Sequence, residues 1–163
     1  MTNRTVICPG SFDPVTLGHM DIISRASVMF DKVIVAVLVN SSKKPVFTAE
    51  ERIYLLKKAL SDFVNVEVQS FDGLLVDYAR QVGASAVVRG LRAVSDFEYE
   101  FQMSLTNKKL YPQMETIFLT TRSEYMFLSS SIVKQIAVLG GDITNFVPEC
   151  IHQEIKTRLS EKK

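Results

Sequence analysis

Several features that would assign a function at once are scarce or missing in this sequence of 163 residues. Its two cysteines, Cys8 and Cys150, are too few for a disulfide framework and lack the spacing of a metal site. No apolar run reaches the roughly eighteen residues that a membrane span requires. Nineteen basic and eighteen acidic residues leave a net charge of +1, without the basic excess of a general nucleic-acid binder. We therefore expect a cytoplasmic protein with reduced thiols that binds neither nucleic acid nor a membrane.

Two familiar phosphate-binding patterns are also missing. No G-x-G-x-x-G pattern follows the first apolar run, and no G-x-x-x-x-G-K-[ST] pattern occurs. The hypotheses of a dinucleotide-binding oxidoreductase and of a P-loop protein therefore lose their main support. The sequence does contain Thr16-Leu17-Gly18-His19, placed between a Pro/Gly turn and an apolar-periodic segment, and a serine run at 129–131.

Short β-branched runs alternate with segments of helical periodicity along the whole chain. Strands are expected at 6–8, 32–39, 64–68, 84–88 and 116–121. Helices are expected between them, with capping boxes formed by Thr48 with Glu51 and by Ser95 with Glu98. Such alternation indicates right-handed βαβ units. The predicted fold is a single α/β domain over 1–163, a Rossmann-like open parallel five-stranded sheet with helices on both faces.

The unusual residues of the chain follow the ends of the expected strands, at 8–11, 40–44, 89–92 and 122–131. Ligands of open parallel sheets bind beyond the carboxyl ends of the strands. The cations in these segments are Lys43, Lys44, Arg89, Arg92 and Arg122. On a chain of nearly zero net charge, their clustering favours a small polyanionic ligand such as a nucleoside triphosphate.

Each candidate also has an ordinary structural explanation. A lone histidine beside a helix start is often a packing residue, but the strand–turn–helix context of His19 suits an imidazole N–H that donates to a phosphate oxygen. The lysines at 43–44 could lie in a solvated loop, and the arginines at 89 and 92 could form ion pairs with Asp96, Glu98 or Glu100. The serines could serve as a helix N-cap, which explains one of the three. The aromatic residues Phe97, Tyr99 and Phe101 are expected to pack in the core and on the helix face.

Taken together, the motifs resemble bacterial phosphopantetheine adenylyltransferases, within the HxGH-type nucleotidyltransferase superfamily. The matching segments are 9–14 (PGSFDP), 16–19 (TLGH), 42–45 (SKKP), 89–100 (RGLRAVSDFEYE) and 128–134 (LSSSIVK). The TLGH and SSS elements alone indicate a nucleotidyltransferase, whereas the long 89–100 block is specific to this family. Ser11, where threonine is frequent, and Leu128, where isoleucine is usual, depart from the common pattern conservatively.

The resemblance implies transfer of the adenylyl group of ATP to 4′-phosphopantetheine, giving dephospho-coenzyme A and pyrophosphate, the penultimate step of coenzyme A biosynthesis. It implies direct in-line attack without a covalent enzyme intermediate, Mg²⁺ as cofactor, a homohexamer, and coenzyme A as a feedback ligand. No residue of the chain is assigned as a metal ligand, because such an ion is bound mainly by substrate phosphates and water.

The family's functional residues transfer by position to this sequence. The catalytic residues are expected to be His19 and Lys43. The phosphopantetheine contacts are expected to be Ser11, Lys43, Leu75 and Arg89. The ATP contacts are expected to be Ser11, Phe12, His19, Gly90, Leu91, Arg92, Glu100, Tyr125, Met126, Phe127, Leu128, Ser129, Ser130 and Ser131.

Two other functions remain open from the sequence. A different nucleotidyltransferase of the same superfamily, acting on nicotinamide mononucleotide or a polyol phosphate, would share the TLGH motif but not the 89–100 block. A non-catalytic nucleotide- or coenzyme A-binding regulator would be expected to have lost His19 or Lys43, and both are present.

Overall fold

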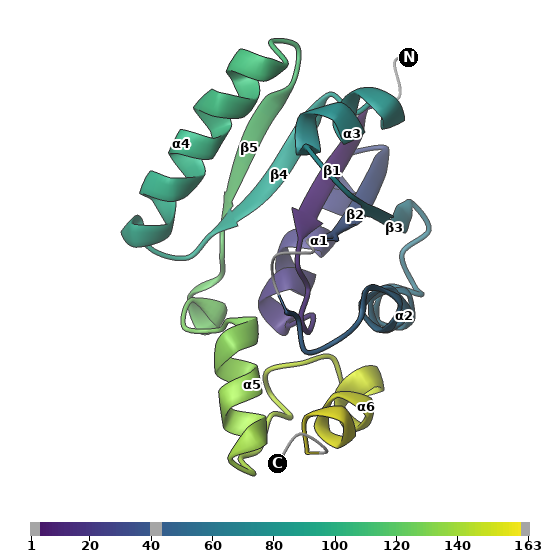
Figure 1. The fold of residues 1–163 in the computed structure, drawn as a ribbon, viewed down its shortest axis with the longest axis vertical. Helices are drawn as coiled ribbons and strands as arrows, with labels where there is room; N and C mark the ends of the chain where they lie inside the picture. The colour runs from purple at the N-terminus through teal and green to yellow at the C-terminus, as the bar shows by residue number, and fades with distance from the viewer. Residues whose placement is uncertain (1–3, 40–43, 161–163) are drawn as a thin grey trace.

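The computed structural model describes residues 4–39 and 44–160 and contains an open sheet of five parallel strands (Figure 1). The strand order is β3-β2-β1-β4-β5, and every pairing is parallel. The strands are β1 (Thr5–Gly10), β2 (Lys32–Leu38), β3 (Val66–Phe71), β4 (Ala86–Leu91) and β5 (Glu115–Thr120). The predicted Rossmann-like sheet is therefore confirmed.

In the described part of the chain, six α-helices and one short 3₁₀ helix connect and follow the strands. They are α1 (Leu17–Met29), α2 (Ala49–Ala59), α3 (Leu75–Val82), α4 (Val94–Leu110), η1 (Ser123–Tyr125), α5 (Ser130–Val138) and α6 (Glu149–Ser160). Figure 1 shows α4 alongside β4 and β5, and α5 and α6 together at the other end of the molecule. Among residues 4–39 and 44–160, no helix combines the length and the apolar character needed to cross a membrane.

Two separate apolar clusters cover the two faces of the sheet. The alternation of side chains along β1 sends Val6 and Cys8 to one cluster and Ile7 to the other. The larger cluster includes buried residues of α1, α2, α5 and α6, and the smaller one includes buried residues of α3. Helices therefore lie on both faces, as predicted.

Several expected helix ends are confirmed. Thr48 and Glu51 form the reciprocal capping box at the start of α2. Gly83 ends α3 in a left-handed conformation, with φ of 66°. The capping box expected for Ser95 and Glu98 is wrong: β4 continues to Leu91, so α4 starts at once at Val94, with Ala93 as a cap that makes no side-chain hydrogen bond. Ser95 therefore lies inside the first turn.

The strand boundaries differ from prediction where pairing overrides local pattern. β3 extends to Phe71 through Gln69 and Ser70 because β2 pairs with it from Val33 to Leu38. β4 likewise runs through Arg89 and Gly90, which pair with β5. Neither extension is visible in hydrophobic periodicity.

The expected core packing of the α4 aromatics is also wrong. Phe97, Tyr99 and Phe101 are 43%, 63% and 45% exposed, and within the described part of the chain no residue of α4 is buried. This helix lies beside β4 and β5 at the edge of the sheet. Most of the surface of α4 is therefore not covered by other parts of the chain.

Candidate active site

A cavity of about 510 Å³ opens at the carboxyl ends of β1 and β4. Because β1 is followed in sequence by β2 on one side while β4 pairs on its other side, this is where the strand order reverses. The cavity is lined by the loop after β1, the start of α1, the end of β4, the first turns of α4, and residues 128–130. The sheet topology thus brings together segments more than 100 residues apart.

Most of the expected site residues line this cavity. They are Ser11, Phe12, His19, Arg89, Gly90, Arg92, Glu100, Leu128, Ser129 and Ser130. The described cavity lining does not include Leu75, Leu91, Tyr125, Met126, Phe127 or Ser131. Leu75 begins α3 and packs against the core on the other face of the sheet. Lys43 lies outside the described residues.

His19 occupies the third position of α1 and takes part in a capping box. The Thr16 backbone N–H donates to Nδ1 of His19 at 3.0 Å, and the His19 backbone N–H donates to the Thr16 hydroxyl at 3.3 Å. An Nδ1 atom that accepts this bond leaves the ring proton on Nε2. Burial, followed by the positive charges of Arg92 and Arg89, lowers the pKa of His19 to about 4. His19 is therefore a neutral imidazole with an N–H donor at neutral pH.

Both arginines of the cavity are held by carboxylates. Arg89 makes a fork-like pair with Glu100, with Nε to Oε2 at 2.8 Å, and its third nitrogen donates to the Pro9 carbonyl at 2.8 Å. Arg92 pairs with Asp96 through Nε at 3.1 Å. The ion pairs considered from the sequence therefore exist for two of the three carboxylates, and the same arginines face the cavity. Pairing fixes the guanidinium groups in position without removing them from the site.

The three serines have three different surroundings. The Ser129 hydroxyl accepts from the Ile132 N–H at 3.2 Å and caps α5, as expected for one of them. The Ser130 hydroxyl donates to the Pro14 carbonyl at 2.7 Å, and Ser131 is exposed. Because Ser129 and Ser130 line the cavity, the N-terminus of α5 lies at its wall.

The chain is similar in sequence to known proteins. A family profile described as Cytidylyltransferase-like matches residues 7–136. Two proteins named phosphopantetheine adenylyltransferase, from Caldanaerobacter subterraneus subsp. tengcongensis and Heliobacterium modesticaldum, are 59% and 54% identical to this chain. The first match covers 98% of this chain and 97% of the relative, and the second covers 96% and 90%. The chain belongs to the phosphopantetheine adenylyltransferase family.

A solved structure supports the fold of this adenylyltransferase family member. The Plasmodium falciparum nicotinic acid mononucleotide adenylyltransferase superposes with a TM-score of 0.68 at 15% identity, covering 99% of this chain and 98% of that one. At that identity the likeness concerns the fold alone.

The adenylyltransferase cavity includes side chains to which sequence reasoning gave other roles or none. Ser95, Asp96 and Tyr99 line it from the first turns of α4, although Ser95 was expected to cap the helix and Tyr99 to pack. The signal was helical spacing within α4, because Ser95 with Tyr99 and Asp96 with Glu100 are each four residues apart and lie on one side of the helix. Thr16 was part of a recognised motif, and the Thr-x-x-His spacing is that of a capping box.

Two residues near strand ends contribute neither a reactive thiol nor a positive charge to the cavity. Cys8 lines the cavity, but burial raises the pKa of its thiol to about 12, against the lowering effect of the Arg89 charge. It is therefore a protonated, poorly nucleophilic thiol. Arg122 bonds instead to the buried carboxylate of Asp21, with Nε to Oδ1 at 3.0 Å, outside the described cavity lining.

Proposed function

We propose that this protein transfers the adenylyl group of ATP to 4′-phosphopantetheine by direct in-line attack, giving dephospho-coenzyme A and pyrophosphate. The enzyme class follows from family membership, since five relatives carrying the family name are 52–59% identical over nearly the whole chain. The observation that carries the mechanism is the cavity itself. It combines a neutral histidine donor, two oriented arginines and a helix N-terminus at the switch point of the sheet.

In this mechanism an oxygen of the acceptor phosphate forms a bond to the α-phosphorus of ATP. The bond from the α-phosphorus to the bridging oxygen breaks, and its electrons leave with pyrophosphate. Negative charge grows on the non-bridging α-phosphate oxygens, and the Nε2–H of His19 is the donor we assign to one of them. The protonated thiol of Cys8 takes no part, which agrees with catalysis by positioning and charge stabilisation.

The other roles in the proposal follow the family resemblance. Arg89, Ser11, Lys43 and Leu75 contact phosphopantetheine, and Lys43 also acts at the reacting centre. The ATP contacts are Ser11, Phe12, Gly90, Leu91, Arg92, Glu100 and residues 125–131. The cavity position of Arg89, Arg92 and Ser129 supports this part of the proposal.

The cofactor in the proposal is Mg²⁺. Both carboxylates in the described cavity lining, Asp96 and Glu100, are already paired with arginines. The donor set therefore fits an ion held by triphosphate oxygens and water, and such an ion neutralises phosphate charge when bound.

The proposal also includes a homohexamer in the cytoplasm with coenzyme A as a feedback ligand. The exposed apolar side chains of α4 support an assembly, since surfaces of this kind are usually covered by another protein surface. Among them are Phe97, Phe101, Leu105 and Leu110. Light scattering after size exclusion tests the assembly, and inhibition by added coenzyme A tests the feedback.

The deciding experiment supplies the protein with Mg²⁺-ATP and either 4′-phosphopantetheine or nicotinamide mononucleotide. We expect pyrophosphate and dephospho-coenzyme A, the latter identified by mass spectrometry, only with 4′-phosphopantetheine. Product formed with nicotinamide mononucleotide would confirm adenylyl transfer but show that the proposed acceptor is wrong. Folded protein that binds ATP but turns over neither acceptor would favour the regulator instead.

A further inference from the structure

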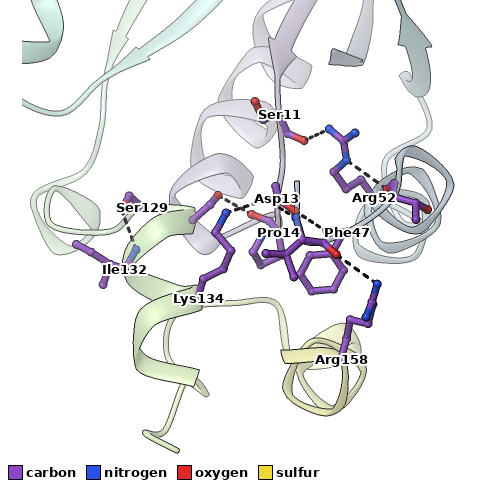
Figure 2. Close-up of polar contacts among 12 residues, drawn as sticks. Ser11, Asp13, Pro14, Phe47, Arg52, Ser129, Ile132, Lys134 and Arg158 are labelled. Atoms are coloured by element: carbon purple, nitrogen blue, oxygen red, sulfur yellow. Dashed lines mark hydrogen bonds and ion pairs between the residues drawn. The ribbon is translucent and has the colours of Figure 1, made fainter. Parts of the chain in front are cut away.

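The carboxylate of Asp13 lies where three segments meet (Figure 2), directly after the cavity residues Ser11 and Phe12 in the chain. It belongs to the loop after β1 and accepts hydrogen bonds from the backbone N–H groups of Val46 and Phe47, at 3.1 and 2.8 Å. It also accepts from Nζ of Lys134, on α5, at 2.7 Å. One side chain therefore joins the loop after β1, the segment that leads into α2, and α5.

Each of the three segments carries, or directly follows, a residue assigned to the site. The loop after β1 carries Ser11, the segment at 44–47 follows Lys43, and the first turn of α5 carries Ser129. Neither Asp13 nor Lys134 is among the described residues that line the cavity. The pair therefore lies outside the described cavity lining and contacts two segments that contribute to the cavity and one that follows Lys43.

A second contact holds α5 to the same loop. The Ser130 hydroxyl donates to the Pro14 carbonyl at 2.7 Å, directly after Asp13 in the chain. Ser130 and Lys134 are one helical turn apart, so both contacts come from one face of α5. Together they determine the distance and rotation of the α5 N-terminus relative to the loop.

The pair is sheltered from solvent. Asp13 is 6% exposed, and the Lys134 side chain is 26% exposed. Burial raises the pKa of Asp13, but Lys134 and the N–H groups of Phe47 and Val46 outweigh it and hold the pKa below its usual range. The carboxylate is thus ionised and accepts from three donors. Loss of the lysine would leave a buried charge only partly compensated.

We propose that the Asp13–Lys134 pair is a positioning element for adenylyl transfer, setting the α5 N-terminus, the loop after β1 and the 44–47 segment in one geometry around ATP. The inference rests on the proposed function. Displacement of reacting groups by about 1 Å can lower turnover on the order of 100-fold. The pair would therefore control kcat more strongly than the affinity for ATP.

The first test is Lys134→Met, with Lys134→Arg as the conservative variant. We expect kcat to fall about 10- to 100-fold in Lys134→Met, with a smaller rise in KM for ATP and partial recovery in Lys134→Arg. Lys32→Met is the matched control, because it removes a lysine paired with Glu67 at 2.8 Å at the amino ends of the strands, away from the cavity. The control should keep wild-type kcat, and thermal unfolding shows that each variant is folded.

A double-mutant cycle separates positioning from direct contact with substrate. If Lys134 acts through Asp13, then Lys134→Met in an Asp13→Asn background should lower kcat by less than about threefold more. A further full loss in that background would mean that Lys134 acts on substrate by itself. Wild-type kcat in Lys134→Met would also overturn the inference.

Hydrogen exchange keeps this test separate from the proposed function. In wild-type protein, saturating ATP should slow amide exchange in peptides covering both 44–47 and 129–131. In Lys134→Met the two segments should no longer respond together. If wild-type protein makes no dephospho-coenzyme A but shows this coupled response, the proposed function is wrong and the positioning role of the Asp13–Lys134 pair still holds. An identical response in wild type and Lys134→Met, or no coupled response in wild type, would overturn the positioning role of the pair.

Discussion

Replacing His19 with alanine removes two interactions that the structure separates. One is the Nε2–H donor at the cavity, and its loss from a charge-stabilising site is expected to lower kcat about 100- to 1,000-fold. The other is the Nδ1 half of the capping box, whose loss costs about 1 kcal/mol of folding stability. A stability change of that size leaves the protein folded at 25 °C.

His19→Gln is the matched variant, because glutamine is a usual third residue of a capping box. Its amide oxygen can accept from the Thr16 N–H, so we expect stability near wild type while turnover stays low. Pyrophosphate release at saturating substrates gives kcat, and urea unfolding gives stability. If His19→Ala keeps kcat within threefold of wild type, His19 is only a helix cap. Turnover in His19→Gln but not in His19→Ala would instead show that an amide N–H can replace the imidazole donor.

The lowered pKa of His19 adds a stability signature in acid. Its pKa is lowered from 6.5 to about 4, so between these values the unfolded chain binds a proton that the folded chain does not. The stability linked to His19 is thus complete above about pH 6.5 and is lost as the pH falls to 4, by up to about 3 kcal/mol. Unfolding free energies measured across this range should decline less in His19→Gln. Equal acid slopes in the two proteins would contradict a neutral imidazole at this partly buried position.

Three further outcomes follow from the same geometry. Arg89→Ala should raise KM for 4′-phosphopantetheine about tenfold or more and KM for ATP less; equal rises in steady-state assays would indicate a structural arginine. A thiol reagent should label exposed Cys150 in folded protein and leave buried Cys8 unmodified until unfolding, which peptide mass spectrometry can follow. Gly90→Ala should destabilise by about 1–3 kcal/mol in urea unfolding, because the added methyl would lie 2.9 Å from Cγ1 of Ile22; unchanged stability would show that Ile22 moves freely.

The local sequence pattern was sufficient to predict features that depend on a single short segment. The capping box of Thr48 and Glu51, the left-handed Gly83 and the Ser129 cap all depend on residues within one turn of each other. Local pattern failed where a distant partner decides. The length of β4 comes from its pairing with β5, and the start of α4 follows from where β4 ends.

The candidate site divides in the same way. Its motifs could be found in the sequence because each is short and contiguous, and strand alternation predicted that they would meet at one sheet edge. The pairing of Arg89 with Glu100 was foreseen only as one of several options, since three carboxylates lie at similar sequence distance. The contacts of Asp13 could not be foreseen at all, because its partners lie more than 30 and more than 100 residues away.

The sequence by itself determined the fold class, the family and the chemical character of the site. Those depend on periodicity and on contiguous motifs, which every copy of the chain carries before it folds. Only the tertiary structure decided the state of the groups within the site: the uncharged form of His19, the pairing of Arg89 and the connection of Asp13 to Lys134. Burial and the close approach of distant charges produce these states, and neither exists until the chain has folded.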